Sequence, residues 1–228
     1  MIEFRGVSRS FSGAPVLVDI NLALGERRIA IIGGNGSGKS TFARLINGLI
    51  VPDDGEVVVD GLSTRKDGPR VRRKVGLVFQ NPEHQIVMPT VEEDLAFGPR
   101  NIGLGAAETE ARMAQLLEGY GLAAKRHLPA HALSGGEKKL LTLLSVLIMQ
   151  PDYIVFDEPM NSLDLAARCR FAATMDALPQ ALITITHDFD LVAGYDRALL
   201  LENGRIAADG PPATVIAAYR ESLGLAAL

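Results

Sequence analysis

The chain has 228 residues, of which 47% are hydrophobic and 22% are charged, a composition typical of a folded domain and not of a disordered segment. Its formal net charge of -4 gives no electrostatic reason to expect a nucleic acid partner, and its single cysteine, Cys169, excludes an internal disulfide. No segment approaches the ~20 apolar residues that cross a bilayer, and the N-terminus lacks the apolar run of a signal peptide, so any membrane role must come through a partner.

A strand pattern and a helix pattern follow each other in the first fifty residues. Val16 to Leu24 alternates at period two, which predicts a half-buried, antiparallel strand. Ile29 to Ile32 is a continuous apolar run, typical of a buried strand in a parallel sheet. Glycine-rich sequence then leads into a predicted helix. The strand's apolar face is expected to hold Val16, Val18, Ile20, Leu22 and Leu24, and the helix's face Leu45, Ile46, Leu49 and Ile50.

The rest of the chain predicts more strands around a helical insertion. Ala106 to Tyr120 has apolar residues at helical spacing, and with Leu140 to Met149 it indicates a helical subdomain at roughly residues 82 to 150. Asn203-Gly204 predicts a tight hairpin near the C-terminus. Strands that alternate with helices favour a mostly parallel sheet edged by antiparallel strands. The other core strands are expected at Glu56 to Asp60, Val75 to Phe79, Tyr153 to Phe156 and Leu182 to Thr186.

Residues 33 to 41 match the phosphate-binding pattern G-x-x-x-x-G-K-[ST] between a strand and an amphipathic helix, which is the context the motif requires. Glycines let backbone N–H groups approach phosphate oxygens, and the helix N-terminus adds partial positive charge. Lys39 is expected to reach the β- and γ-phosphates, and the Ser40 hydroxyl to ligate Mg²⁺. A plain glycine-rich turn is the simpler alternative. The predicted nucleotide-binding residues are Gly33, Asn35, Gly36, Ser37, Gly38, Lys39, Ser40 and Thr41.

A second apolar strand, Tyr153 to Phe156, ends in two carboxylates, Asp157 and Glu158. In an open α/β sheet the ligand crevice lies at the carboxyl ends of the strands. Asp157 is therefore expected to hold Mg²⁺ through water, and Glu158 to polarise the attacking water as a general base. A solvated pair of acids at a strand end is the alternative interpretation.

The sequence LSGGE at residues 133 to 137 resembles the signature of the ATP-binding cassette (ABC) ATPases, and that family's other motifs follow in order. Gln80 lies where the Q-loop begins, and Asn161 to Asp164 resembles the D-loop. His187 follows a strand as the family's switch histidine does, and Phe11 lies where an aromatic ring stacks on adenine. Because the resemblance covers essentially the whole chain, the sequence is identified as a member of this family.

The resemblance implies an α/β fold, the P-loop NTPase of ABC ATPase type, with a mostly parallel sheet, an antiparallel β edge and an inserted α-helical subdomain. Residues 1–228 are expected to form a single ABC ATPase domain, with a RecA-like core and antiparallel β subdomain at 1–81 and 151–228 and the signature subdomain at 82–150. ATP and Mg²⁺ are the implied cofactors, and ATP hydrolysis is the implied activity. The implied catalytic residues are Glu158, His187 and Gln80, and the implied metal ligands are Ser40, Gln80 and Asp157.

The signature also has a physical interpretation of its own. Ser134 as N-cap, with Glu137 three residues later, predicts a capping box at the start of a helix. The family implies more: Ser134, Gly135, Gly136 and Glu137 bind the γ-phosphate of ATP held by a second subunit, and Asp164 runs along the dimer seam. Two subunits arranged head-to-tail then complete two sites.

Three features depart from the family's common pattern. Glu137 stands where Gln is usual, and its charge completes the cap but opposes a nearby phosphate. Met160 replaces a usual Thr, and residues 138 to 141 are atypical. These departures bear on rate and affinity and not on the family.

The segment Gln80 to Pro99 resembles the corresponding part of energy-coupling factor (ECF) vitamin and metal-ion importers. In that group the segment shapes a groove for the coupling helices of a membrane scaffold protein, so the resemblance implies docking by Gln85, Glu92, Glu93 and Asp94. A compatible alternative is that Thr90 and Glu93 form a second capping box, with further acids in the first helical turn.

The resemblance implies three partners: a second ATPase subunit, expected to be an identical copy, a transmembrane scaffold protein and a membrane substrate-capture protein, with no nucleic acid. Because the chain lacks the added C-terminal region of some shared-module ECF ATPases, we expect a dedicated system for biotin, cobalt or nickel, with a slight preference for biotin. The subunit is then expected at the cytoplasmic face of the bacterial inner membrane.

Other functions stay open at this point. A subunit of a conventional ABC transporter differs from the ECF type only in its membrane partner. A soluble ABC ATPase of DNA repair or translation is disfavoured, because the interval from Gln80 to Ser134 is short and the chain carries one cassette and no basic patch. A GTPase is disfavoured because the sequence lacks the base-reading motif Asn-Lys-x-Asp.

Overall fold

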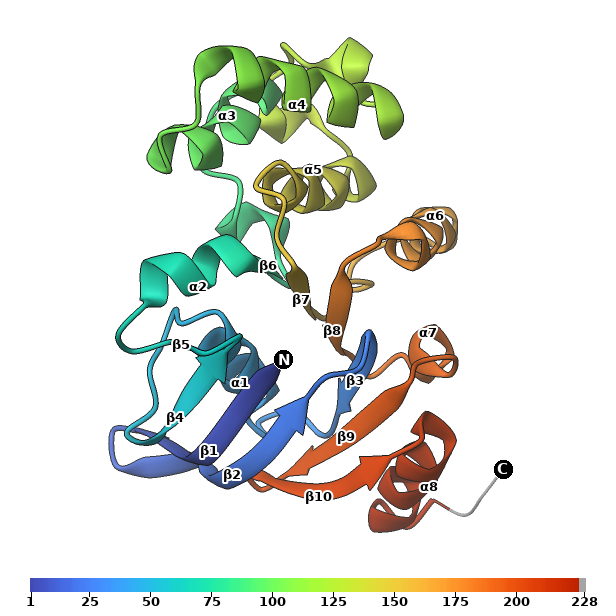
Figure 1. Cartoon of the computed structure of the whole chain (residues 1–228). Coiled ribbons are helices and arrows are strands. Elements are labelled where there is room, and N and C mark those ends of the chain that lie inside the picture. Colours follow the sequence, from blue (N-terminus) through green and yellow to red (C-terminus); the bar gives the residue numbers. More distant parts are fainter. Residues whose placement is uncertain (226–228) are drawn as a thin grey trace. The chain divides into compact units, whose positions relative to one another are not determined.

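The computed structural model describes residues 1–225 and divides into two compact units. The first unit comprises Met1–Leu77, Asp152–Glu158 and the described residues from Gln180 onward. The second comprises Val78–Pro151 and Pro159–Pro179. Figure 1 labels their helices and strands.

An antiparallel sheet in the first unit has the strand order β2-β1-β4-β5. The predicted antiparallel strand at residues 16–24 is confirmed, because β2 pairs antiparallel with β1. Strand β1 itself was not predicted. The strands are β1 (Ile2–Phe11), β2 (Ala14–Leu24), β4 (Asp54–Val59) and β5 (Leu62–Ser63).

The predicted apolar face of β2 is only partly right. Ile20 and Leu24 are buried, but Leu17 is buried in place of Val16 and Val18, which are half-buried. A bulge is the reason: the register between β1 and β2 shifts along this stretch, and Asp19 has a positive φ of 50°. An extra residue in one strand reverses which side chains face the core.

The second sheet of the first unit has the order β10-β9-β3-β8-β7-β6. Strand β3 runs parallel to β8 and β9, β7 runs parallel to β8, and β10 pairs antiparallel with β9. The predicted mostly parallel sheet with an antiparallel edge is therefore confirmed. The strands are β3 (Arg28–Ile32), β6 (Val75–Val78), β7 (Tyr153–Asp157), β8 (Ala181–Ile185), β9 (Arg197–Glu202) and β10 (Arg205–Gly210).

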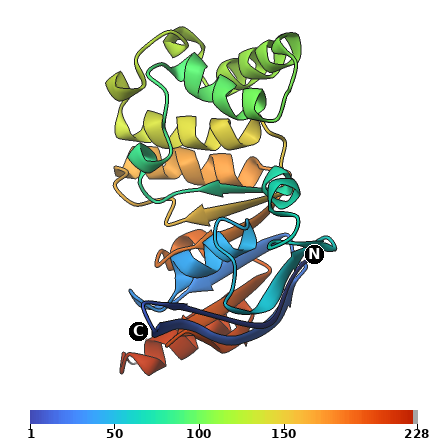
Figure 2. The ribbon, with the colours of Figure 1, turned by 90° about the vertical axis from the view of Figure 1, so that its left-hand side faces the viewer.

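Helix α1 (Lys39–Ile46) lies between the two sheets of the first unit, as Figures 1 and 2 show, and contacts strands of both. The ring of Phe42 on α1 stacks on Phe4 of β1, with centroids 4.3 Å apart. The prediction that Leu49 shares the buried helix face is wrong, because its exposed fraction is 48%. Gly48, with a φ of 69°, follows the end of the helix and turns the chain away.

The described residues of the first unit also form α2 (Gly68–Lys74), α7 (Phe189–Val192) and α8 (Pro212–Ser222), none of which was predicted. Between β9 and β10 the predicted hairpin is confirmed: Asn203 and Gly204 both have positive φ, 48° and 73°, as a tight two-residue turn requires. Val192 of α7 and Val215 of α8 join a buried cluster with Ala30 and Leu200 of the sheet.

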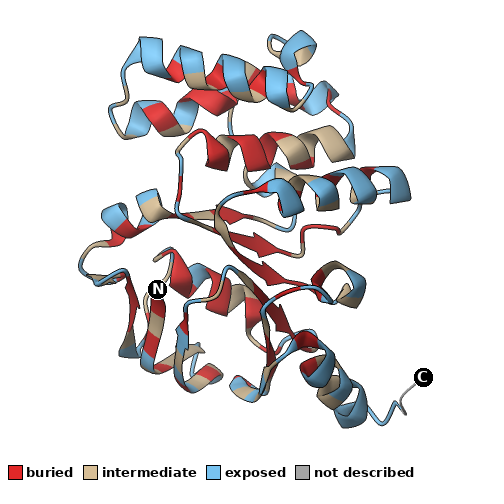
Figure 3. Cartoon of the chain, turned by 45° about the vertical axis from the view of Figure 1, so that its right-hand side comes forward, coloured by how far each residue is buried: buried red, intermediate tan, exposed pale blue. Residues whose placement is uncertain are grey.

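The second unit is helical. It contains α3 (Val91–Asn101), α4 (Ala106–Gly119), α5 (Gly135–Leu147) and α6 (Leu165–Ala177), joined by the 3-10 turns η1 (Pro82–His84), η2 (Ala123–Lys125) and η3 (Ala130–Ala132). Helix α5 packs on α3 and α6, and Figure 3 shows that much of its length is buried, whereas α4 exposes a long outer face. Met113 and Leu117 of α4 are buried as predicted, while Leu116 and Tyr120 are half-buried.

Within residues 1–225, no helix combines the length and the apolar character that a membrane span needs.

Candidate nucleotide-binding site

Glycines shape the loop between β3 and α1. Gly33, Gly36 and Gly38 have positive φ values of 146°, 79° and 104°. Residues with a Cβ atom adopt such values only at an energetic cost, so these positions favour glycine. Space also limits position 33, because a Cβ atom there would lie 2.2 Å from the backbone oxygen of Leu201. The chain enters α1 directly after this loop, so the unpaired N–H groups of the first helical turn lie at the loop.

Two buried polar side chains belong to the same loop. The Lys39 ammonium donates hydrogen bonds of 2.8 Å to the carbonyl oxygens of Gly33 and Gly34, and Lys39 is only 8% exposed. Burial lowers the pKa of Lys39, against the opposing effect of the acids at the end of β7. The Ser37 hydroxyl is buried and has no hydrogen-bond partner among the described residues. An ammonium and an unpartnered hydroxyl in a glycine loop fit the oxygens of a triphosphate.

Ser40 and Asp157 meet beside this loop. The Ser40 hydroxyl donates a hydrogen bond of 3.2 Å to Asp157 Oδ1. Asp157 ends β7 and is 5% exposed. A hydroxyl and a carboxylate are the hard oxygen ligands that Mg²⁺ prefers. The pair therefore fits the predicted metal-binding role.

Glu158 and His187 also lie together, at the carboxyl ends of two neighbouring parallel strands. His187 Nδ1 lies 2.9 Å from Glu158 Oε2, and the carboxylate side chain is 12% exposed. The backbone of Glu158 has a φ of 48°, unusual for a residue with a side chain, and its N–H donates to the carbonyl of Ile185 at 2.9 Å. Such strained positions cluster at functional sites. The arrangement fits a general base that a histidine orients.

Phe11 ends β1 and leaves 42% of its surface exposed. The guanidinium carbon of Arg9 lies 4.7 Å from the centroid of the Phe11 ring, a cation–π contact that holds one face of the ring. An exposed aromatic ring is available for stacking on a base, and the adenine contact stays a prediction.

The LSGGE segment forms the N-terminus of α5 as predicted. Glu137 donates its backbone N–H to Ser134 Oγ at 3.4 Å, and Ser134 donates its backbone N–H to Glu137 Oε2 at 3.0 Å. This capping box is confirmed, and so is the second one, formed by Thr90 and Glu93 at the start of α3. Both helix ends are thus closed by their own side chains.

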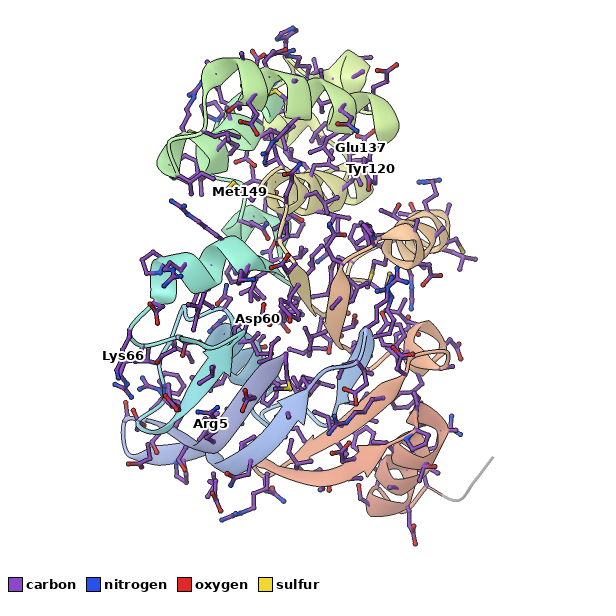
Figure 4. The ribbon with its side chains drawn as sticks, viewed as in Figure 1. Arg5, Asp60, Lys66, Tyr120, Glu137 and Met149 are labelled. Carbon is purple, nitrogen blue, oxygen red and sulfur yellow. The ribbon has the colours of Figure 1, made fainter. Side chains whose placement is uncertain are left out.

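An open cavity of about 660 Å³ lies at the N-terminus of α5, within the second unit. Ser134, Gly136 and Glu137 line it, together with Asp164, whose carboxylate caps α6 by accepting the N–H of Ala167 at 2.8 Å. Figure 4 shows Glu137 close to Tyr120, which also lines the cavity. The signature and the predicted D-loop residue thus share one cavity.

Comparison with known families decides the assignment. Residues 17–161 match the family model described as ABC transporter. The chain belongs to the ABC transporter family.

Its relatives are ATP-binding subunits of such transporters. The chain is 55% identical over 223 residues to a "Putative ABC transporter ATP-binding protein" of Deinococcus radiodurans, covering 98% of this chain and 99% of the relative. It is 46% identical over 220 residues to the biotin transport ATP-binding protein BioM of Rhizobium etli, covering 96% and 98%. It is 43% identical over 206 residues to the energy-coupling factor transporter ATP-binding protein EcfA1 of Symbiobacterium thermophilum, covering 88% and 71%.

Two solved structures are similar throughout. The cbiO1 protein of Clostridium perfringens, part of the ABC transporter complex cbiONQ, superposes with a TM-score of 0.81 at 30% identity, covering 95% of this chain and 90% of that one. A dimeric ATP-binding cassette, MJ0796, bound to ADP and Pi has a TM-score of 0.81 at 25% identity, covering 93% and 99%. The predicted ABC ATPase fold and the ATPase activity are confirmed, and the ECF interpretation of residues 80–99 agrees with these names.

In this ABC ATPase the predicted Q-loop is fastened to helix α5. The fully buried Lys139 donates hydrogen bonds of 2.9 Å to the carbonyls of Phe79 and Gln80. Gln80 itself is exposed and belongs to the second unit, whereas Ser40 and Asp157 belong to the first, so its catalytic and metal-binding roles stay predictions. Our sequence reasoning missed Lys139. The signal was its position on the buried face of α5, at helical spacing from Leu143.

The four residues expected to dock a membrane partner all have interactions inside the ATPase. Gln85 accepts the N–H of Phe79 at 3.0 Å and donates to the carbonyl of Thr142 at 2.8 Å. Asp94 is 4% exposed, accepts the N–H groups of Val87 and Met88, and has a pKa raised by burial. These contacts fold the loop before α3.

The two glutamates of that set are more accessible. Glu92 bonds Arg126 Nε at 2.9 Å and His127 Nδ1 at 3.0 Å, and Glu93 closes the cap of α3. Hydrogen bonds, led by that of Arg126, lower the pKa of Glu92. Docking by Glu92 and Glu93 stays a prediction, and Arg126 is a residue near that surface that the sequence did not single out.

Proposed function

We propose that this chain is one of two identical ATP-hydrolysing subunits of an ECF-type importer, arranged head-to-tail. Its first unit supplies the phosphate loop, and its second supplies the signature. The observation that carries this proposal is the cavity of about 660 Å³ at the N-terminus of α5, which signature and D-loop residues line together. A helix N-terminus with two adjacent glycines favours a phosphate group. A second copy would supply that phosphate as part of its bound ATP.

Within the first unit the contacts support a division of roles. Lys39, Ser37 and the N–H groups of the loop bind the phosphates, and the exposed Phe11 ring stacks on adenine. Glu158 accepts a proton from the attacking water, while His187, 2.9 Å away, holds the carboxylate and contacts the γ-phosphate.

Mg²⁺ fits the Ser40–Asp157 pair, with Gln80 as the third ligand that the family pattern supplies. The ion would neutralise charge that develops on the phosphate oxygens. Thr41 and Asn35 complete the set of loop residues that we assign to nucleotide binding.

Closure of the dimer around ATP and its release after hydrolysis would drive transport through membrane proteins. The similarity to BioM, at 46% identity over nearly the whole length, supports biotin as the cargo, and the similarity to the cobalt import protein CbiO supports a metal ion as the alternative. We assign the subunit to the cytoplasmic face of the membrane, bound to a scaffold protein and a substrate-capture protein.

The base assignment is tested with Glu158→Gln. We expect turnover, measured as phosphate release, to fall by about 100-fold or more while ATP binding is retained, because the amide cannot accept the proton. ATP should then hold the variant as a stable dimer in sedimentation. The matched control is Glu202→Gln, a carboxylate that ends strand β9, which β3 and β8 separate from β7 in the same sheet, and this variant should leave turnover unchanged. Wild-type turnover in Glu158→Gln would show that the base is misassigned.

The importer type is tested by co-purification from membranes. A small scaffold protein together with a substrate-capture protein is expected for the ECF type. A pair of larger permeases would indicate a conventional ABC transporter, with the ATPase assignment unchanged.

A further inference from the structure

Glu137 places a negative charge where the proposed function requires a phosphate to bind. Its backbone lies in the first turn of α5, and its side chain lines the same cavity as Ser134 and Gly136. A carboxylate without a nearby positive charge would repel a triphosphate at this position, because two negative charges a few ångströms apart at a protein surface repel each other. Some feature of the chain must offset this charge if the acid-containing signature is to work.

Lys125 lies on the 3-10 turn η2 and forms an ion pair with Glu137 Oε1. The other carboxylate oxygen, Oε2, accepts the backbone N–H of Ser134 at 3.0 Å. The two oxygens of Glu137 are thus divided between the lysine and the helix cap. The hydrogen bond from Lys125, followed by that from the Ser134 backbone, lowers the pKa of Glu137, so the carboxylate is charged at neutral pH.

The backbone of Lys125 is itself held in place. Its N–H donates to the carbonyl of Leu122 at 2.9 Å, and its carbonyl accepts the N–H of Leu128 at 3.0 Å. The lysine side chain is 36% exposed and that of Glu137 28% exposed. The pair is therefore partly shielded from water, and a fixed turn presents the ammonium to the signature helix.

We infer that Lys125 is a positioning residue for the signature: it neutralises Glu137 and holds that carboxylate in the capping box, so that the N-terminus of α5 accepts the phosphate of a second copy's ATP. This inference rests on the proposed head-to-tail dimer. Arg170, which also lines the cavity, adds positive charge there. Lys125 makes the direct ion pair with Glu137.

The test is a double-mutant cycle in the Glu158→Gln background, with ATP-driven dimerisation followed by sedimentation. Lys125→Ala should raise the ATP concentration needed for half-maximal dimer by about tenfold, the size expected for one uncompensated charge near a phosphate. When Lys125→Ala is combined with Glu137→Gln, this ATP concentration should return to within about twofold of the parent's value, because no uncompensated carboxylate remains. Additive effects of the two substitutions would instead indicate that the two residues are not coupled. Lys125→Arg should behave like the parent. Arg70→Ala, which removes an equal charge and breaks an exposed ion pair with Asp67, is the control and should change nothing.

A second readout separates positioning from mere loss of folding. In the otherwise wild-type chain, Lys125→Ala should raise KM for ATP with kcat at saturating ATP little changed, and ATP analogue binding by the monomer should be unaffected. The inference is overturned if Lys125→Ala dimerises like its parent, or if Glu137→Gln does not relieve its defect. If the Glu158→Gln parent itself never dimerises with ATP, the proposed head-to-tail dimer is wrong. That result differs from a failure of the Lys125 inference, in which the parent dimerises normally.

Discussion

The N-termini of α1 and α5 differ in how their first backbone N–H groups are satisfied. Each helix begins with unpaired N–H groups that attract an anion. At α1 the N-cap is Gly38, which has no side chain to accept them, and the first turn holds no acid. At α5 Ser134 and Glu137 close the helix end with a capping box. Under the proposed function, the helix end that binds the ATP of its own chain is left uncapped by side chains, whereas the end that binds the ATP of a second copy is capped by its own side chains.

The glycines of the two regions differ in how strictly their positions require glycine. Position 33 requires it for two reasons: its φ is 146°, and a Cβ atom there would lie only 2.2 Å from a backbone oxygen. Gly136 faces a milder limit, because its Cβ would lie 3.1 Å from Ala167 Cβ. The phosphate loop is thus fixed by its backbone, and the signature is fixed by side chains that cap it.

Among the substitutions that test the difference between the two helix ends, Lys39→Ala is expected to have the largest effect. Its buried ammonium is the fixed positive charge of the open loop, so ATP affinity should fall by about 100-fold, or ~2.7 kcal/mol. Titration with ATP measures the change. Lys66→Ala, which removes an exposed lysine of the same unit visible in Figure 4, should leave affinity unaltered. An unchanged affinity in Lys39→Ala would refute the role of the loop.

A smaller effect, a difference of about 2 kcal/mol in the free energy of unfolding, separates the two glycine variants. Gly33→Ala should reduce the free energy of unfolding by about 3 kcal/mol, because the added methyl meets fixed backbone at a strained φ. Gly136→Ala should cost less than about 1 kcal/mol, since a shift of a few tenths of an ångström by helix α6, which carries Ala167, relieves the contact. Urea denaturation of both variants measures the difference. Equal losses would mean that the signature is as rigid as the phosphate loop.

The smallest effect concerns the cap of α5. Ser134→Ala removes the oxygen that accepts the Glu137 N–H, so the chain should lose about 1 kcal/mol of stability. Ser134→Asn, which retains a capping oxygen, should keep most of it. Thermal unfolding gives the comparison. If alanine and asparagine behave alike, the capping box contributes nothing to stability, and the closed state of this helix end must have another origin.

Motifs made of neighbouring residues were predictable from the sequence. The phosphate loop, the caps at Ser134 and Thr90, and the Asn203-Gly204 turn each depend on atoms within a few positions along the chain, so spacing alone specifies their hydrogen bonds. The sequence placed Glu158 and His187 each at the end of a predicted strand, but only the family resemblance implied that the two act together.

Contacts between distant positions had to come from the tertiary structure. The bulge at Asp19 moved Leu17 into the core, and Gly48 ended α1 before Leu49 could join it. The bond from Lys139 to Gln80 and the ion pair of Lys125 with Glu137 join segments that no local pattern relates. The sequence by itself determined the phosphate loop, the helix caps and the family, because short-range geometry fixes backbone conformation. Only the tertiary structure decided which charges are paired and which faces are buried, because those depend on what folding brings beside them.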